Sequence, residues 1–362
     1  MKDGKKGIPV ERGEKILVIR VGHGGDLVMI TPALRALLAA FPAAEVHLLA
    51  GRDGGRILGD FDPRLTRVWS FHRRFPGRLL VQRRLDRQIR TEGYTRIYVF
   101  ESKPFYRRWL DGAAPALFAL AAGTTGHFCD LCLDLVQQSV AAPIDRSWVS
   151  LPVSPAGLAR ARELLDGAGV GGGGRLVGLH PTFSGTSLPI FRDRQGVRHR
   201  MWPPAHFARL AALLRQEAQR TGTTLAVIID ALPQERSYAE AIVRLSGGEI
   251  VLLAEAPDFQ RYKGLLQCLD VLVTPNTGPM HIAAAVGTPL VALFSRWQAA
   301  ECGPYMDPAR YRVLAAEAAA EPRRGLAAIQ PEAVAEAVWS LLQTARAPAG
   351  GIGPQAPAEP QT

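Results

Sequence analysis

Two blocks of alternating strand and helix patterns constrain the fold of this chain most strongly. The first block opens at residues 15–21 with KILVIRV, a mainly aliphatic run that is typical of a strand buried on both faces. The second block restarts at residues 176–180 with LVGLH. Strands that alternate with helices predict parallel sheets with helices on both sides. A chain of 362 residues is too long for one compact core and fits two domains.

The same patterns give the expected elements. In the first block we expect strands at 15–21, 45–50, 67–71 and 96–101, and helices from the Gly-rich turn to about residue 40 and over 107–122. In the second we expect strands at 176–180, 224–230, 249–253, 271–274 and 290–294, and helices over 205–219, 234–245, 259–268 and 278–286. A helix over 331–344 closes the fold.

The domain boundaries follow from composition. The prediction is a disordered N-terminus at 1–13, a first domain at 14–155, a second at 156–330, the closing helix, and a disordered tail at 345–362 rich in Pro, Gly, Ala and Gln. Pro152 and Pro155 mark the crossing between domains. The fold class is therefore α/β, with two Rossmann-like domains facing across a cleft that is lined by the carboxyl ends of both sheets, where ligands bind in such folds.

Several protein classes are disfavoured by composition. No apolar run is long enough to span a bilayer, and the first residues, MKDGKKG, lack the apolar core of a signal peptide, so we expect a cytoplasmic protein. The four cysteines fit a reducing compartment. Cys129 and Cys132 form a lone C-x-x-C with no second pair and no nearby His at ligand spacing, so no metal site is expected.

Positive charge is concentrated in one segment. The chain has a net charge of +10, and residues 67–108 hold twelve Lys or Arg against three acids, a balance of 12 − 3 = +9. One interpretation is a solvated helix face opposite an apolar side, formed by Arg83, Arg84, Arg87 and Arg90 against Val81, Leu85 and Ile89. The other is a surface for a polyanion such as membrane lipid or a phosphorylated acceptor. The segment has no recognised nucleic-acid motif, so nucleic acid is not an expected partner.

A strand, a tight turn and a helix follow one another at residues 273–285, VTPNTGPMHIAAA. The unpaired N–H groups and the dipole of a helix start favour an anion, so Asn276, Thr277 and Gly278 predict a phosphate site. The alternative is an ordinary unit with Thr277 as its N-cap. His281, one turn further on, either contacts the phosphate or is a buried histidine that bonds the backbone.

A Gly-rich turn, VGHGGDLV, follows the first strand. Gly24 and Gly25 would let the backbone approach a ligand, and Asp26 starts the next helix either as an N-cap or as a carboxylate facing the cleft. A dinucleotide fingerprint would need a third glycine at Leu27, which disfavours an NAD enzyme.

Two more groups of polar residues follow strands of the second block. Thr182 and Ser184 offer hydroxyls, and Arg200 offers a bidentate cationic donor ahead of Trp202-Pro203-Pro204, which is typical of a helix entry. The alternative is a basic surface loop. Glu235 would accept from ribose hydroxyls or serve only as a first-turn charge.

Together, in this order and spacing, these motifs resemble glycosyltransferase family 9, the bacterial heptosyltransferases of lipopolysaccharide core assembly. The resemblance covers residues 15–344. Three motifs carry it: Gly25-Asp26 with Thr31-Pro32-Ala33-Leu34, His180-Pro181 leading to Arg200-Met201-Trp202-Pro203, and Asn276-Thr277-Gly278-Pro279-Met280-His281.

The resemblance implies a GT-B fold whose second domain binds an ADP-sugar and whose first domain binds the acceptor, with Gly24 and Gly25 in its phosphate loop. It implies inverting transfer without a metal or other cofactor, from ADP-heptose to an anionic lipid-linked glycan at the inner membrane surface. Asp26 falls on the family's base, Arg200 and Asn276-Thr277-Gly278 on its diphosphate binders, and Glu235 on its ribose contact. Thr182, Ser184 and His281 complete the expected donor site.

Some residues depart from the family pattern. Asn276 stands where Asp is usual, Arg200 where Lys is commoner, and the loop at 186–199 is longer. Ala254-Glu255-Ala256 replaces the usual Gly-Lys/Arg-Thr, so the donor base or sugar can differ. The alternatives are a nucleotide-sugar enzyme with another donor and a non-catalytic GT-B binding protein.

Overall fold

The computed structural model describes residues 13–71, 78–182, 199–295, 299–319 and 322–344. The predicted disordered ends and Ser184 lie outside these residues, as does most of the loop at 186–199. The chain divides into two compact units, the first ending at Leu151 and the second beginning at Pro152. The division falls four residues before the predicted boundary, since 155 − 151 = 4.

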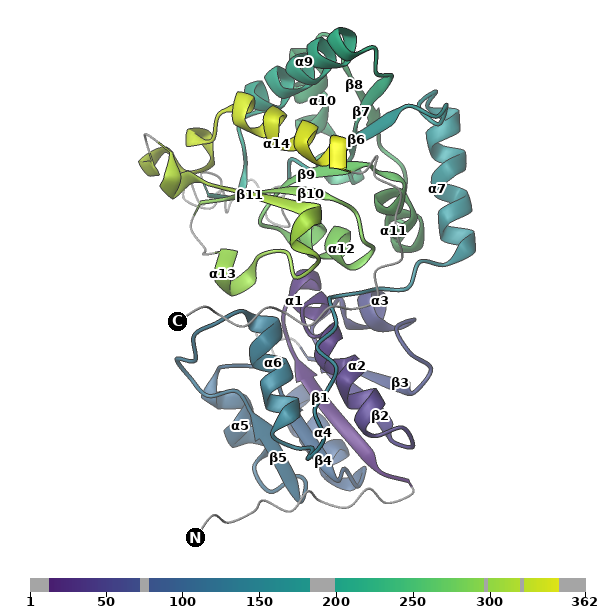
Figure 1. Cartoon of the computed structure of the whole chain (residues 1–362). Helices are drawn as coiled ribbons and strands as arrows, with labels where there is room; N and C mark the ends of the chain where they lie inside the picture. The colour runs from purple at the N-terminus through teal and green to yellow at the C-terminus, as the bar shows by residue number, and fades with distance from the viewer. Residues whose placement is uncertain (1–12, 72–77, 183–198, 296–298, 320–321, 345–362) are drawn as a thin grey trace. The chain divides into compact units, whose positions relative to one another are not determined.

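The first unit alternates strands and helices throughout. Its elements are β1 (Lys15–Arg20), α1 (Gly24–Val28), α2 (Thr31–Ala40), β2 (Glu45–Ala50), α3 (Gly54–Leu58), β3 (Leu65–Ser70), α4 (Arg78–Thr91), β4 (Arg96–Val99), α5 (Pro104–Leu110), β5 (Ala116–Ala119) and α6 (Phe128–Gln137). Among the described residues, five strands pair in parallel in the order β3-β2-β1-β4-β5 (Figure 1). This is a Rossmann-like order with β1 at the centre.

One core of the first unit lies between the sheet and helices α4 and α5. Leu17 and Ile19 of β1 are fully buried against Leu85 and Ile89 of α4 and against Trp109 of α5. On the helix surface of α4 these two apolar positions are one turn apart, as an amphipathic helix requires. The sequence prediction for this helix is wrong at Val81, which is 36% exposed rather than part of the buried face.

The second unit repeats the pattern with one more strand. Its elements are α7 (Pro155–Gly167), β6 (Arg175–Leu179), α9 (Pro204–Thr221), β7 (Leu225–Asp230), η2 (Pro233–Glu235), α10 (Arg236–Leu245), β8 (Ile250–Leu253), α11 (Phe259–Cys268), β9 (Val271–Pro275), α12 (Gly278–Ala285), β10 (Leu290–Phe294), α13 (Ala299–Cys302), η3 (Pro308–Arg310), β11 (Tyr311–Ala315), η4 (Ala316–Ala318), η5 (Pro322–Ala328) and α14 (Pro331–Thr344). Among the described residues, six parallel strands run in the order β11-β10-β9-β6-β7-β8. If β6 is counted as the first strand, the sheet has the complete strand order of a doubly wound fold.

Helices cover both faces of the second sheet. Helices α9, α10 and α14 lie on one side and α11 and α12 on the other (Figure 1). Val177 of β6, Val273 of β9 and Val291 of β10 are fully buried in the same core as Leu210 of α9 and Val338 of α14. The predicted closing helix therefore belongs to the core of the second unit.

The predicted helix over residues 107–122 is wrong. Helix α5 ends at Leu110, the backbone turns through Gly112 at φ +66, and Ala116–Ala119 forms β5, paired with β4. Alanine-rich sequence favours a helix by local propensity, but pairing with a buried neighbouring strand overrides that weak preference. The helix expected up to residue 40 is also two helices, because Pro32 stands in the first turn of α2 and cannot continue α1.

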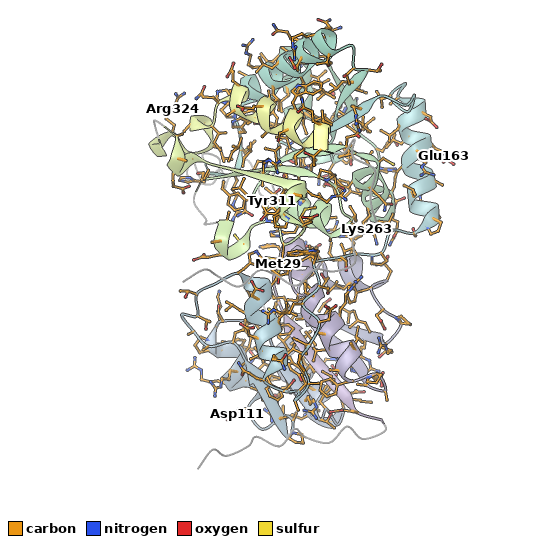
Figure 2. The ribbon with its side chains drawn as sticks, in the orientation of Figure 1. Met29, Asp111, Glu163, Lys263, Tyr311 and Arg324 are labelled. Atoms are coloured by element: carbon orange, nitrogen blue, oxygen red, sulfur yellow. The ribbon has the colours of Figure 1, made fainter. Side chains whose placement is uncertain are left out.

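Two glycines allow α7 and α11 to pack closely. A Cβ at Gly264 would lie 2.7 Å from the Gly157 carbonyl oxygen, and a Cβ at Gly157 would lie 2.5 Å from the Gln260 carbonyl oxygen. Both are below any real contact distance. Lys263, beside this crossing on α11, is fully buried, whereas Glu163 on the outer side of α7 is exposed (Figure 2). Pro155, predicted to lie in the crossing between domains, is instead the first residue of α7.

The variant Gly264→Ala is expected to lower the free energy of unfolding by about 1–3 kcal/mol, because its methyl group overlaps rigid backbone. Gly167→Ala, at the far end of α7, is the matched control. A Cβ there meets nothing within 4 Å, so alanine is expected to stabilise the helix by about 0.5–1 kcal/mol. Urea unfolding measures both. Equal effects of the two substitutions would contradict the close packing.

Candidate active site

Each sheet has a switch point, where the strand order reverses. In the first sheet it lies between β1 and β4, and in the second between β6 and β9. Ligands of doubly wound sheets bind outside the carboxyl ends of the strands at such a point. The predicted residues follow these strands: Asp26 follows β1, Thr182 follows β6, and Thr277 follows β9. Each unit thus has a candidate site of its own.

In the first unit, two groups hold the Asp26 carboxylate. Oδ1 accepts a hydrogen bond from Arg20 Nη2 at 2.8 Å, and Oδ2 accepts from the His23 backbone N–H at 2.7 Å. Asp26 is the third residue of α1 and His23 is the N-cap, so the predicted N-cap role of Asp26 is wrong. The carboxylate caps the helix from inside its first turn and, at 30% exposed, stays within reach of a ligand.

Arg20 belongs to a polar network that sequence reasoning missed. Its Nη1 donates to the Phe100 carbonyl oxygen at 3.0 Å and lies 3.8 Å from Oε1 of Glu101. That buried Glu101 oxygen also accepts from the Val21 N–H at 2.8 Å. The guanidinium carbon lies 4.1 Å from the ring centroid of Phe128. The ion pair with Glu101 and stacking on Phe128 fix the Arg20 guanidinium, which in turn orients Asp26.

Close approach in the Gly-rich turn occurs at a different glycine from those predicted. A Cβ at Gly22 would lie 2.4 Å from both Cβ and Oδ2 of Asp26, so any other residue would displace the carboxylate. At Gly24 a Cβ would meet the Ile57 side chain, with Cδ1 at 3.4 Å and Cγ1 at 3.6 Å, which are ordinary contacts. The roles predicted for Gly24 and Gly25 in a phosphate loop stay predictions.

In the second unit, the turn after β9 is closed by its own hydroxyls. The fully buried Thr274 Oγ1 donates to the Pro275 carbonyl oxygen at 2.9 Å, and Thr277 Oγ1 donates to the same oxygen at 3.3 Å. Thr277 occupies the N-cap position of α12 in extended conformation, yet its side chain makes no cap hydrogen bond. The side-chain amide of Asn276 contacts Cys302 Sγ at 3.4 Å.

The start of α12 offers fewer donors than predicted. Pro279 has no N–H, and the Met280 N–H donates to the Thr277 carbonyl oxygen at 3.1 Å. Because the Thr277 side chain leaves the first turn uncapped, the Gly278 N–H is the donor best placed for an anion. His281 is 7% exposed, and its predicted contact with a donor phosphate stays a prediction.

A partly buried group of titratable residues lies at the carboxyl ends of β6 and β7. Glu235 is 9% exposed and its Oε2 accepts from the Leu232 N–H at 3.1 Å, so it caps the turn before α10. Burial raises the pKa of Asp230 to about 6, helped by the negative charges of Glu235 and Glu255 and opposed by Arg261. Burial lowers the pKa of His180, while the Glu235 charge acts in the opposite direction. The Asp230 carboxyl at the end of β7 is therefore less readily ionised than an exposed one.

The pH dependence of stability tests this environment. The folded pKa of Asp230, about 6, exceeds its ordinary value of 3.8, so the native carboxyl holds its proton more tightly and stability falls as pH rises between these values. Asp230→Asn cannot ionise. Its stability relative to the wild type is expected to rise by about 3 kcal/mol from pH 3.5 to pH 7.5, from about 1.4 kcal/mol per unit of pKa.

Urea unfolding at a series of pH values measures this difference. Asp62→Asn is a control of opposite sign, because the Arg64 hydrogen bond lowers the pKa of Asp62. The native Asp62 carboxylate contributes stability above its unfolded pKa, and this is lost as pH falls. The stability of Asp62→Asn relative to wild type should therefore fall with rising pH. If the stability difference between Asp230→Asn and the wild type did not change with pH, the raised pKa of Asp230 would be contradicted.

The segment that carries Arg200 is anchored on both sides. Before it, His199 Nδ1 lies 2.5 Å from Oγ of Ser295, which follows β10. After it, Trp202 is fully buried, and its Nε1 donates to the Ile329 carbonyl oxygen at 3.0 Å. Pro204 is the first residue of α9, which confirms the predicted helix entry. The anchors place the segment at the carboxyl edge of β10, in the same sheet as β9.

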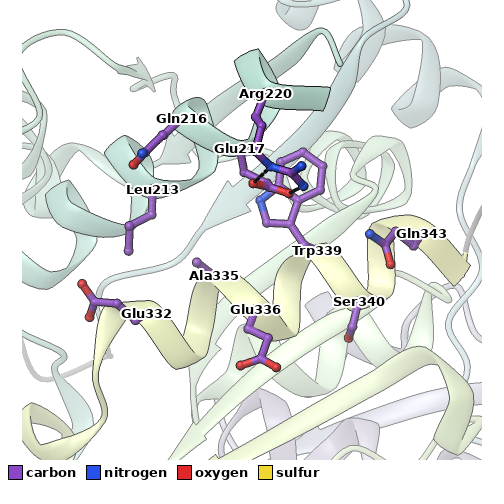
Figure 3. A pocket seen from close by; sticks show the side chains of 10 residues that line it. All are labelled: Leu213, Gln216, Glu217, Arg220, Glu332, Ala335, Glu336, Trp339, Ser340 and Gln343. Carbon is purple, nitrogen blue, oxygen red and sulfur yellow. Dashed lines mark hydrogen bonds and ion pairs between the residues drawn. The ribbon is translucent and has the colours of Figure 1, made fainter. Parts of the chain in front are cut away.

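Other features contain no predicted site residue. A groove of about 590 Å³ lies between α9 and α14 and is lined by Glu217, Arg220 and Trp339 among others (Figure 3). Cys129 and Cys132 are fully buried on α6, and burial raises the pKa of both thiols. Among the described residues, no three His, Cys, Asp or Glu side chains are grouped closely enough to hold a metal ion.

A family comparison identifies the chain. The sequence model described as glycosyltransferase family 9 (heptosyltransferase) matches residues 133–328, more than half of the chain. The chain belongs to glycosyltransferase family 9. The matched segment includes the second-unit candidates Thr182, Arg200, Glu235, the turn at Asn276 to Gly278, and His281. Asp26 precedes it, so the family match does not address the proposed role of this carboxylate.

Solved structures show the same fold. The glycosyl transferase family 9 protein from Veillonella parvula DSM 2008 has a TM-score of 0.75 at 16% identity, covering 93% of this chain and 99% of its own. The E. coli ADP-heptose lps heptosyltransferase II has a TM-score of 0.67 at 20% identity, covering 92% and 100%. The E. coli heptosyltransferase WaaC with ADP has a TM-score of 0.64 at 16% identity, covering 90% and 99%. No curated protein sequence matches significantly. This family 9 member thus has the α/β, GT-B-like fold that the sequence predicts.

Proposed function

We propose that this family 9 member is an inverting glycosyltransferase that moves a heptose or related sugar from an ADP-sugar to an anionic, lipid-linked glycan of the cell envelope. The observation that carries the proposal is the Asp26 carboxylate, which Arg20 and the His23 N–H hold at the switch point of the first sheet. A solved E. coli relative contains ADP, which supports an adenine nucleotide as donor.

In the proposed reaction, a hydroxyl of the acceptor loses its proton to Asp26 as its oxygen attacks the anomeric carbon of the donor sugar. A general base of this kind contributes about 10²–10⁴-fold. The bond from the anomeric carbon to the diphosphate oxygen breaks on the opposite face, so the configuration inverts. The transition state resembles an oxocarbenium ion, as in glycoside hydrolysis.

The leaving ADP gains negative charge as this bond breaks. We assign its stabilisation to the Arg200 guanidinium, the Gly278 N–H and the Thr182 and Thr277 hydroxyls, aided by the dipole of α12. Glu235 uses Oε2 to cap its own turn, and its other oxygen is assigned to a ribose hydroxyl. The three-residue 3-10 helix η2 that ends at Glu235 brings this carboxylate to the carboxyl edge of β7.

Calorimetry with ADP, UDP and GDP, followed by transfer assays with the matching sugar donors, tests the proposal. We expect ADP to bind most tightly and ADP-heptose to be consumed with an equal amount of ADP released, giving a product of inverted anomeric configuration by NMR. Transfer from a UDP- or GDP-sugar alone would instead indicate a different donor. Tight ADP binding without turnover on any envelope glycan acceptor would indicate a binding protein.

A further inference from the structure

Helix α4 exposes apolar and basic side chains on the same surface of the first unit. Leu79 is 61% exposed, Leu80 71% and Val81 36%. Arg83, Arg84 and Arg87 follow them and are also exposed, whereas Leu85 and Ile89 on the opposite face are buried. With 100° per residue, Leu80, Arg83, Arg84 and Arg87 share the outward face of α4. We refer to Leu79, Leu80, Val81, Arg83, Arg84 and Arg87 as the α4 surface.

The charges of the α4 surface are not neutralised within the described part of the chain. Arg90, on the same helix, pairs with Asp86 at 2.9 Å, and Arg67 pairs with Glu92 at 2.9 Å. No ion pair of Arg83, Arg84 or Arg87 occurs among the described residues. Two leucines exposed by more than half beside three such arginines form an apolar patch with a basic rim, which is typical of an interaction surface.

We propose that the α4 surface docks on an anionic lipid bilayer, with Leu79, Leu80 and Val81 entering the boundary between headgroups and acyl chains. Amphipathic helices that lie in a membrane surface combine an inserted apolar edge with Lys or Arg beside it. Charge complementarity selects the partner, because each arginine near an anionic leaflet adds to the attraction. Of the described helices, none combines the length and apolar character needed to cross a membrane.

The role of the α4 surface rests on the proposed function, because an enzyme has to reach a lipid-anchored acceptor at the membrane surface. The segment that holds the α4 surface belongs to the unit that contains Asp26, the proposed site of acceptor activation. Docking would raise the local concentration of acceptor at that unit. Vesicle binding needs neither donor nor acceptor and can therefore be measured apart from transfer.

Cosedimentation of the full chain with vesicles of phosphatidylcholine, with or without phosphatidylglycerol, tests the proposal. We expect binding only to the anionic vesicles. The triple variant Arg83→Gln, Arg84→Gln, Arg87→Gln should bind on the order of 100-fold more weakly, or about fivefold per arginine. Leu79→Ala with Leu80→Ala should weaken binding by about tenfold or more. The matched control on α10, Arg244→Gln with Leu245→Ala, removes an exposed arginine and a leucine that is 59% exposed, and should leave binding unchanged.

A second measurement reports insertion directly. In Leu80→Trp, anionic vesicles are expected to shift the added tryptophan emission to the blue, and lipids brominated near the headgroup should quench it. The proposed insertion would be contradicted if the protein did not bind vesicles, or if the variant Leu79→Ala with Leu80→Ala bound them as tightly as the wild type. Self-association that the leucine variant abolishes, with vesicle binding intact, would assign this face to a second copy of the chain. Sugar transfer to a water-soluble acceptor without vesicle binding would contradict only the proposal of a docking surface. Vesicle binding without sugar transfer would contradict only the proposed function.

Discussion

Replacing Asp26 by Asn is expected to lower kcat for sugar transfer by about 10²–10⁴-fold, the range typical of a lost general base. Asparagine has nearly the same shape and can still accept from the His23 N–H, but it cannot take the proton of an acceptor hydroxyl. The affinity for ADP, measured by calorimetry, should stay unchanged, because the proposed donor contacts are all in the second unit. The loss therefore appears in turnover and not in donor binding.

The pH profile separates loss of a base from loss of an ion pair. In the wild type, kcat should fall on the acid side as the base becomes protonated, and in Asp26→Asn this limb should disappear. Asp53→Asn is the matched control, because Asp53 also pairs with an arginine, Arg56, at 2.8 Å in the first unit but lies outside the network around Arg20. Wild-type turnover by Asp26→Asn would exclude this carboxylate as the base.

The network behind Asp26 shows why part of the site was not predictable. Arg20 and Asp26 are six residues apart, but Glu101 and Phe128 reach them only because β4 pairs with β1 and α6 follows β5. A sequence pattern reports local periodicity and turn chemistry. It does not report which of the many charged residues after other strands meet at one switch point. The rule that ligands bind at switch points would have pointed to Glu101 once the strand order was known.

The fold itself was largely predictable where local signals agree with tertiary packing. Strands β2 and β10 and helices α11 and α14 have the predicted bounds, since mainly apolar strand segments and strong helical periodicity leave little choice. The strands that were missed, β5 and β11, are at the edges of their sheets and have partly exposed side chains. Such strands depend on pairing with a neighbour, and their sequences have no buried aliphatic run. Helices α3, α6 and α7 were missed as well.

The site in the second unit was predicted in outline and differs in detail. The strand, turn and helix around Thr277 are present, but Pro279 and the Met280 hydrogen bond reduce the donors at the helix start. The positions of His180 and Asp230 beside Glu235 depend on the pairing of β6 with β7. Composition could not show that burial would raise the pKa of Asp230 to about 6, because burial is a property of the folded chain.

Trp202→Ala is expected to lower the free energy of unfolding by about 3–5 kcal/mol, the range for truncating a buried aromatic side chain. The Trp202 indole is fully buried, with its ring centroid 4.9 Å from that of Phe207, and its Nε1 donates to the Ile329 carbonyl oxygen at 3.0 Å. Alanine leaves a cavity and removes the Trp202 hydrogen bond from the Ile329 carbonyl oxygen, which also accepts from His206. Because Arg200 is two residues away, we also expect ADP affinity to fall. Urea unfolding and calorimetry measure the two effects.

Two variants separate the contributions to the Trp202→Ala effect. One isolates the hydrogen bond from the packing of the ring, and the other measures the cost of removing a tryptophan elsewhere in the same unit. Trp202→Phe keeps most of the buried ring but not the N–H, so its cost should be about 0.5–1.5 kcal/mol, that of one hydrogen bond. Trp339→Ala removes a partly buried indole from the groove between α9 and α14 (Figure 3). The Trp339 Nε1 has no acceptor among the described residues, so no hydrogen bond is lost there. A cost for Trp339→Ala as large as that for Trp202→Ala would mean that Trp202 is not a specific anchor of the Arg200 segment. Trp202→Ala could lower stability while ADP affinity stays at the wild-type value. In that case, either His199 alone holds Arg200 or Arg200 is not a diphosphate ligand. Arg200→Ala separates these two outcomes, because it weakens ADP binding only if Arg200 is a diphosphate ligand.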